Sequence, residues 1–91
     1  MRLVFSERAW RGYLYWQQHN PAVLARINDL IEECRRDPFR GTGKPEPLKD
    51  KLQGFWSRRI TDEHRLVYRM SGKRPDQELE IAQCRFHYTA N

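Results

Sequence analysis

The amino-acid sequence predicts an α+β domain in which two N-terminal helices pack on one face of a mainly antiparallel, twisted sheet. Apolar residues recur at helical spacing early in the chain and alternate with polar residues later in it. A run of helices followed by a run of strands is typical of α+β domains. The 91 residues leave room for one hydrophobic core, so we expect a single domain over residues 1–91 in the order β-α-α-β-β-β. The other face of the sheet would remain available for a substrate or partner.

The chain begins with a short apolar segment, residues 2–5, which predicts a strand. Ser6 is a suitable N-cap, and Glu7 follows in the first turn, where a negative charge is favoured by the helix dipole. The first helix is expected to run to about Gln18. The residues that mark its helical spacing are Trp10, Tyr13, Leu14 and Gln17.

The second helix has clear signals at both ends. Asn20 followed by Pro21 is a helix-start pattern, and Pro38 is a stop signal. Arg35 and Arg36 lie near the C-terminal end, which favours positive charge. The apolar stripe between these ends consists of Val23, Leu24, Ile27, Leu30, Ile31 and Cys34.

Residues 38–54 contain three glycines and three prolines, so we expect an ordered loop or a few turns there. A loop of this length inside a small domain is often functional. Three strands follow it. They are predicted over residues 55–60, 65–70 and 79–86, joined by a turn at 61–64 and a longer, charged turn at 71–77.

The net charge of +5 and the isoelectric point of about 9.6 suit a partner that is a polyanion, such as nucleic acid or an acidic protein. The two cysteines, Cys34 and Cys84, are expected to be buried and reduced, as in cytoplasmic proteins. Cysteine and histidine spacings match no zinc site, so we expect neither metal nor cofactor. The apolar run at residues 3–5 is too short for a signal peptide or membrane span, and we expect a cytoplasmic protein without membrane contact.

Glu46 is the candidate general base. It lies between Pro45 and Pro47, which restrict the backbone on both sides, and Lys44 and Lys49 flank it with positive charge. A rigid backbone matters because geometry decides whether a base can act. Taken in isolation, the spacing favours a solvated loop carboxylate at Glu46 over a catalytic base.

His87 is the candidate general acid, because an imidazole can carry a proton near neutral pH. Taken in isolation, a frayed terminal histidine is the favoured interpretation. The position of His87 between Phe86 and Tyr88, directly after an apolar strand, argues against it. Tyr88 could stack on a base or belong to the core, whereas Trp56 is assigned to the core.

Arginines on the predicted strands are candidates for bidentate phosphate contacts. They are Arg58, Arg59, Arg65, Arg69 and Arg85. A short connection between the first two of these strands would place Arg59 opposite Arg65. The alternative is that the arginines decorate a solvated face, which suits Arg69 better than the Arg58–Arg59 pair. A base, an acid and one or two cations could together give substantial cleavage of RNA without a metal.

Six stretches of the chain resemble one toxin family. They are YLYWQ at 13–17, RRDPF at 35–39, GTGKPEPLK at 41–49, GFWSRRIT at 54–61, EHRLVY at 63–68 and CRFHY at 84–88. Together they are similar to the YoeB toxins of the RelE/ParE superfamily, and the resemblance covers nearly the whole chain. It implies the RelE-like microbial RNase fold and the toxin role in a type II toxin–antitoxin pair.

The resemblance also implies a reaction and its residues. Such toxins enter the ribosomal A site and cleave the mRNA there, which leaves a 2′,3′-cyclic phosphate and a 5′-hydroxyl. By position, Glu46 matches the general base, His87 the general acid and Arg65 the phosphate-stabilising arginine. The matching substrate-binding positions are Lys49, Arg59 and Tyr88. No cofactor is implied.

The implied partners are an acidic, YefM-like antitoxin, the ribosome with its mRNA, and a second copy of the chain. Two features depart from the family pattern. The chain continues beyond the His-Tyr pair through residues 89–91, and the turn at 71–77 is longer than usual. We expect the longer turn to affect ribosomal RNA contacts or dimer packing.

Two other function classes share the basic surface. A non-catalytic module could block the ribosome or an RNA, and would depend on its arginines but not on Glu46. A ParE-like gyrase poison could use the same fold, although the set of Glu46, Arg65 and His87 argues against it.

Overall fold

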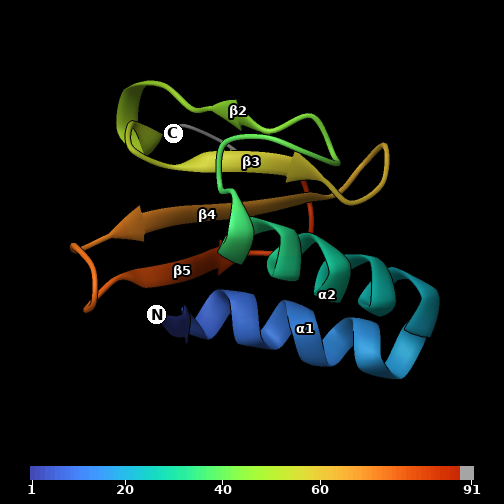
Figure 1. Ribbon diagram of the computed structural model, residues 1–91. Coiled ribbons are helices and arrows are strands. Elements are labelled where there is room, and N and C mark those ends of the chain that lie inside the picture. Colours follow the sequence, from blue (N-terminus) through green and yellow to red (C-terminus); the bar gives the residue numbers. More distant parts are fainter. Residues whose placement is uncertain (89–91) are drawn as a thin grey trace.

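The computed structural model describes residues 1–88 and confirms the predicted fold class. Helices α1 (Glu7–His19) and α2 (Pro21–Arg36) pack on one face of a five-stranded mixed sheet (Figure 1). The strands are β1 (Arg2–Phe5), β2 (Glu46–Pro47), β3 (Trp56–Arg59), β4 (Arg65–Ser71) and β5 (Glu78–Gln83), and a 3-10 turn, η1, spans Asp50–Leu52. Their order across the sheet is β1-β5-β4-β3-β2, with β1 parallel to β5 and the other pairs antiparallel. Of the described helices, none is both long and apolar enough to cross a membrane.

The predicted helix starts are confirmed in detail. The Ser6 hydroxyl accepts a hydrogen bond from the Ala9 amide at 3.0 Å, and the Asn20 side chain accepts one from the Val23 amide at 3.3 Å. These bonds satisfy main-chain donors that have no partner inside the first turn. Asn20 also ends α1, because its own amide donates to the Trp16 carbonyl.

The prediction of a loop over residues 38–54 is wrong in one respect, because this segment contains a short strand, β2. β2 pairs with β3, with Glu46 opposite Ser57. Pro47 has no N–H to donate, and an edge strand tolerates this whereas a central strand does not. At the other end, β5 stops at Gln83 and not at the predicted residue 86.

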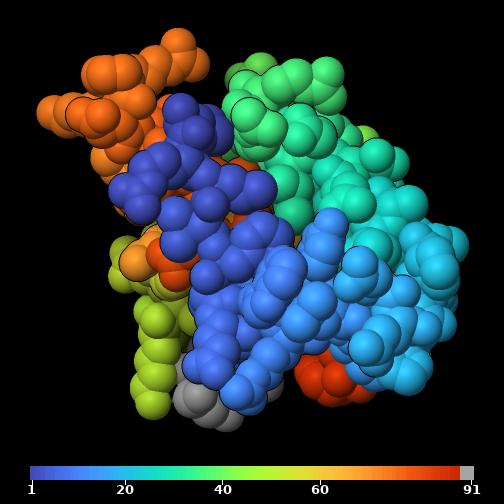
Figure 2. Space-filling model, turned by 90° about the horizontal axis from the view of Figure 1, so that it is seen from below, coloured from blue at the N-terminus to red at the C-terminus, as the bar shows by residue number. Residues whose placement is uncertain are grey.

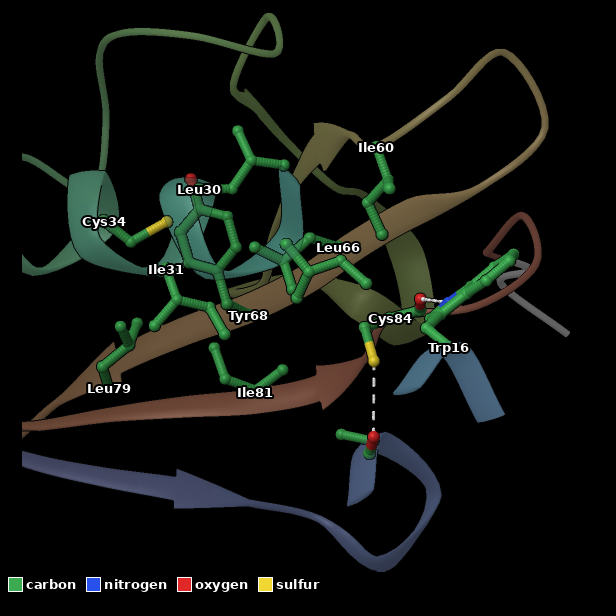
Figure 3. Packing of buried hydrophobic residues seen from close by; sticks show 12 residues of the cluster. Trp16, Leu30, Ile31, Cys34, Ile60, Leu66, Tyr68, Leu79, Ile81 and Cys84 are labelled. Atoms are coloured by element: carbon green, nitrogen blue, oxygen red, sulfur yellow. Dashed lines mark hydrogen bonds between the residues drawn. The ribbon is translucent and has the colours of Figure 1, made fainter. Parts of the chain in front are cut away.

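The core lies between the helices and the sheet (Figure 3). Its buried members include Ile27, Leu30, Ile31 and Cys34 from α2, and Leu66, Tyr68, Leu79 and Ile81 from the sheet. Trp56 packs against it, as predicted. Both cysteines are buried and unpaired by disulfide, also as predicted. Burial raises the pKa of Cys34 to about 11 and that of Cys84 to about 12, so both are thiols at neutral pH.

Strand register decides which side chains face away from the helices. We call this side of the sheet the open face. Leu66 and Tyr68 of β4 belong to the core, so the intervening Val67 points to the open face. Val67 pairs with Ser57 on one side and Gln83 on the other, and Ser57 pairs with Glu46. Glu46 therefore ends a row of residues that crosses the open face.

Candidate active site

A second row on the open face holds two arginines. Arg59 at the end of β3 pairs directly with Arg65 at the start of β4, as the short connection predicts. This pair lies two residues along each strand from Ser57 and Val67, on the same side of the sheet. The register therefore brings two guanidinium groups and the Glu46 carboxylate onto one surface.

Glu46 opens onto a hollow of about 310 Å³. The residues that line it are Glu46, Pro47, Leu48, Lys49, Asp50, Leu52 and Tyr88. Three predicted site residues, Glu46, Lys49 and Tyr88, thus share one cavity, although Tyr88 is far from the others in the sequence. Lys49 is exposed and directly precedes η1, which contributes Asp50 and Leu52 to the lining.

His87 is exposed and lies beside this hollow, but is not part of its lining. Its ring stacks on the ring of Tyr88, with centroids 4.6 Å apart and an interplanar angle of 27°. His87 Nδ1 also lies 2.9 Å from the Tyr88 carbonyl oxygen. The candidate acid is therefore joined to the Glu46 hollow through Tyr88. Residues 89–91 lie outside the described residues.

Gln83 fixes the segment that carries His87. Its side-chain amide is buried and donates to the carbonyl oxygens of Arg85, Phe86 and His87 at 2.9, 3.1 and 3.2 Å. Because Gln83 points to the open face, these bonds draw the last described residues back over the sheet. In Figure 1 the red segment after β5 runs past β4 toward β3. Gln83 has no sequence signal that distinguishes it from any other strand glutamine.

Arg65 is partly immobilised by the turn that precedes it. Its Nη1 donates to the carbonyl oxygens of Thr61, Asp62 and His64 at 2.8, 3.0 and 3.2 Å. Among the described residues, its side-chain hydrogen bonds all come from this one nitrogen. The guanidinium is thus held in place while its remaining N–H groups can face a phosphate.

Arg58, predicted as a phosphate-binding candidate, is instead a buried structural residue. It is 0% exposed and points toward the helices, opposite in direction to Arg59. Its guanidinium donates to the carbonyl oxygens of Asp37, Arg40 and Thr42 at 2.7, 2.7 and 3.2 Å. These bonds fold the connection between α2 and β2 around the Arg58 side chain. This connection is the segment that leads to Glu46.

Glu33 and Tyr68 complete the shell around Arg58. Glu33 accepts the Thr42 amide at 2.8 Å and lies 3.5 Å from Arg58 Nη1. The hydrogen bond from Thr42 lowers the pKa of Glu33, with Arg58 acting in the same direction. The Tyr68 hydroxyl accepts from Arg58 Nε at 3.1 Å and donates to the Pro38 carbonyl at 2.6 Å. Burial raises the pKa of Tyr68, which therefore stays a phenol.

Gly43 lets this loop approach β3 closely. Its φ is +86°, and a Cβ there would lie 3.1 Å from both the Arg58 Cβ and the Arg59 carbonyl oxygen. The Gly43 carbonyl accepts the Arg59 amide at 2.7 Å. The backbone is thus pinned to β3 two residues before Pro45, so the stiffness predicted around Glu46 begins upstream of the prolines.

The two remaining arginines have other contacts. Arg69 pairs with Glu80 at 2.8 Å and lies over the ring of Phe55. Arg85 lies 3.4 Å from the ring centroid of Tyr15. Of the five predicted arginines, Arg59 and Arg65 are therefore the two that share the open face with Glu46 and form no ion pair among the described residues. Within residues 1–88, no cluster of three or more His, Cys, Asp or Glu side chains could hold a metal ion.

Comparisons with known proteins show which family the chain belongs to. Residues 5–88 match the family model of the YoeB-like toxin of bacterial type II toxin-antitoxin systems. The toxin YoeB of Escherichia coli strain K12 is 56% identical over 88 residues, which cover 97% of this chain and all of that protein. A solved YoeB/ParE toxin from Agrobacterium tumefaciens superposes with a TM-score of 0.92 at 53% identity, covering 97% of this chain and all of that one.

Two solved structures from Staphylococcus aureus show such toxins in assemblies. A YoeB dimer superposes with a TM-score of 0.86 at 40% identity, and the toxin of a YoeB-YefM complex with 0.84 at 42%. In both comparisons the match covers 97% of this chain and 98% of the other. Identity of this extent over nearly the whole chain shows the family, and the chain belongs to the YoeB-like toxins of bacterial type II toxin-antitoxin systems.

Proposed function

We propose that this chain is a ribosome-dependent endoribonuclease that cleaves mRNA in the ribosomal A site and so inhibits translation. The reaction is a metal-independent transesterification. The observation that carries the proposal is that Glu46, Lys49 and Tyr88 line one hollow on the open face, with His87 stacked on Tyr88. Arg59 and Arg65 supply positive charge on the same face.

In the proposed step, Glu46 accepts the proton of a ribose 2′-hydroxyl. The 2′-oxygen forms a bond to the adjacent phosphorus, and the bond from phosphorus to the 5′-oxygen breaks. His87, as the imidazolium, gives its proton to that departing oxygen. The products are a 2′,3′-cyclic phosphate and a 5′-hydroxyl, so protons and bonds balance. Each of the two proton transfers is worth on the order of 10²–10⁴ in rate.

The cations act on the phosphate and not on protons. Negative charge builds on its non-bridging oxygens as the 2′-oxygen attacks, and fixed cations lower the barrier because they need no reorganisation at that moment. Arg65 is suited to this because the turn carbonyls already hold its guanidinium. Arg59 and Lys49 are exposed and bring further positive charge to the bound strand. The stacked pair of His87 and Tyr88 offers an aromatic surface to a base.

The experiment is cleavage of a defined mRNA on programmed ribosomes, read by primer extension and by the chemistry of the new ends. Glu46→Gln and His87→Ala should each lower the single-turnover rate at least about 10²-fold. Asp29→Asn, an exposed carboxylate on α2, is the matched control and should cleave normally. Full cleavage by both site variants would refute the assignment.

The same experiment separates the other function classes. A module that only blocks the ribosome would stop translation without producing new 5′ ends. A gyrase poison would leave mRNA intact and produce double-strand breaks when purified gyrase acts on supercoiled DNA. Either result would replace the nuclease by the corresponding function.

We also propose that an acidic, YefM-like antitoxin neutralises this chain, and that the chain acts in the cytoplasm, where ribosomes are. The net charge of +5 and the exposed cations beside the Glu46 hollow suit an acidic segment. The YoeB-YefM complex of Staphylococcus aureus supports this. Addition of such a protein should abolish cleavage at equimolar amounts and do so less effectively at high salt.

A second copy of the chain is the other proposed partner. Leu3 and Trp10 are 45% and 48% exposed, and both line a hollow of about 450 Å³ between β1, α1 and α2. Figure 2 shows this side of the molecule, with the blue chain of β1 and α1 across it. An exposed apolar patch beside an edge strand is typical of an interface. The dimer of the Staphylococcus aureus relative supports the same conclusion.

A further inference from the structure

A second histidine, His64 in the turn between β3 and β4, contacts the segment that carries His87. His64 Nδ1 lies 2.7 Å from the main-chain nitrogen of Phe86. A main-chain N–H can only donate, so Nδ1 accepts and the proton of the neutral ring is on Nε2. The ring is half-buried and packs edge-on against Trp16, with centroids 4.8 Å apart at 83°. His64 is thus oriented by the core on one side and bonded to the C-terminal segment on the other.

Phe86, the residue that His64 binds, has a strained backbone. Its φ is +69°, in the left-handed region that residues with a side chain rarely adopt. Such a conformation is energetically unfavourable and persists only where the surroundings impose it. Here they do, because the Phe86 carbonyl accepts from the Arg65 amide at 3.0 Å and from Gln83 Nε2 at 3.1 Å. With the bond to His64, both main-chain polar groups of Phe86 are fixed.

The turn at Phe86 sets the direction of the next two residues. Tyr88 reaches the Glu46 hollow, and His87 stacks on Tyr88. If φ of Phe86 relaxed to a negative value, the chain after it would leave in another direction and carry both rings away from the hollow. Gln83 holds three carbonyls of this segment, but His64 is the group that holds the Phe86 amide.

We propose that His64 is a positioning residue whose acceptor nitrogen holds the strained turn at Phe86 and thereby keeps His87 and Tyr88 at the Glu46 hollow. It contacts neither substrate nor the reacting atoms. This inference rests on the proposed function, in which His87 is the general acid. The two imidazoles then have opposite roles, since His64 accepts a hydrogen bond and His87 donates a proton.

Two variants of similar size separate the acceptor from the bulk of the ring. His64→Asn places a carbonyl oxygen close to the position of Nδ1, whereas His64→Leu has no acceptor. We expect His64→Leu to lower the single-turnover cleavage rate on the order of 10²-fold, with half-saturation by ribosomes unchanged, because a small displacement of a reacting group has that effect. His64→Asn should recover the rate to within about threefold. A full rate in His64→Leu, or an equal loss in both variants, would overturn the proposal.

Hydrogen exchange of the Phe86 amide tests the same contact without reference to cleavage. Loss of one hydrogen bond worth about 1 kcal/mol should speed its exchange at least about fivefold in His64→Leu and not in His64→Asn. Glu63→Leu, an exposed neighbour in the same turn, is the control and should leave the exchange unchanged. Unchanged exchange in His64→Leu refutes the positioning role, whereas cleavage that survives His87→Ala refutes the proposed function and leaves this contact intact.

The unmodified protein offers a third test that does not depend on how the variants fold. Ring nitrogen NMR shifts distinguish an accepting nitrogen from a protonated one. We expect Nδ1 of His64 to show the accepting type and Nε2 the protonated type. A proton on Nδ1 would contradict the bond from the Phe86 amide and with it the proposal.

Discussion

Arg59 and Arg65 face each other as a directly opposed pair on β3 and β4, on the side of the sheet away from the helices. Like charges placed directly opposite destabilise a sheet, by up to about 1 kcal/mol. The fold tolerates this cost in the row of residues next to the row that Glu46 ends. A bound phosphate would remove it, because one anion can neutralise both guanidinium groups.

The first prediction is that Arg59→Thr raises stability while it lowers activity. Removal of one charge relieves the repulsion and should increase the free energy of unfolding by about 0.2–1 kcal/mol. Loss of a cation from the bound phosphate should lower the cleavage rate by about 10-fold or more. Urea denaturation and single-turnover cleavage measure the two effects.

Arg69→Thr is the matched control for this prediction. Arg69 lies on the same face of β4 but pairs with Glu80 at 2.8 Å. Its replacement should lower the free energy of unfolding by less than about 1 kcal/mol and leave cleavage unchanged. If Arg59→Thr destabilised the protein as Arg69→Thr does, the repulsion between Arg59 and Arg65 would be disproved.

The second prediction concerns Arg58, which holds the connection between α2 and β2. Arg58→Met should lower the free energy of unfolding by about 3–5 kcal/mol, because Glu33 and several main-chain carbonyls lose their buried donor. This is a large part of the 5–15 kcal/mol typical of small domains. Tyr68→Phe removes only one hydroxyl of the same cluster and should cost about 1–3 kcal/mol. Equal urea midpoints for Arg58→Met and the unmodified protein would contradict this role.

The difference between Arg58 and Arg59 shows what the sequence could and could not predict. Caps such as Ser6 and Asn20 act within three residues of themselves, so local patterns found both helices. The burial of Arg58 depends on carbonyls that converge from residues 37, 40 and 42 only after the chain has folded. The spacing of residues in the sequence therefore could not predict that Arg58 is buried.

The same distinction applies to the strands and to the site. β2 was missed because two prolines exclude a central strand, although an edge strand accepts them. Residue type and resemblance nominate Glu46 and His87 as candidates, but they do not predict the contacts of Gln83 and His64 with the last turn. These contacts join β5 and the β3–β4 turn to a segment without regular structure. The residues involved belong to no periodic sequence pattern, so the sequence does not indicate the contacts.

The third prediction is a dependence of stability on pH that arises from Glu33. Its pKa in the folded protein is lowered from the ordinary value of 4.5, chiefly by the Thr42 amide. A carboxyl whose pKa is lowered on folding adds stability above its unfolded pKa, and this contribution is lost as the pH falls through the folded value. The urea midpoint should therefore fall as the pH decreases below about 4.5.

Glu33→Gln tests the origin of this dependence. The amide keeps an acceptor for Thr42 but has no charge, so the variant should be less stable at pH 7 and lose less stability between pH 5 and pH 3. Glu32→Gln is the control on the same helix, because its carboxylate is 67% exposed and pairs with Arg35 on the surface. An identical pH profile for Glu33→Gln and the unmodified protein would show that other carboxylates dominate.

The last prediction concerns self-association through the apolar patch of Leu3 and Trp10. A tryptophan at the centre of an interface contributes about 2 kcal/mol or more, so Trp10→Ser should weaken the dimer at least about 30-fold. Sedimentation velocity over a range of concentrations measures this shift. Phe39→Ser is the control, because Phe39 is 50% exposed but lies in the loop after α2, outside the patch. A dimer that weakens with Phe39→Ser and not with Trp10→Ser would move the interface to that loop. Cleavage by the Trp10→Ser monomer would show in addition that one copy holds a complete site, as expected if Glu46, Arg65 and His87 all come from the same chain.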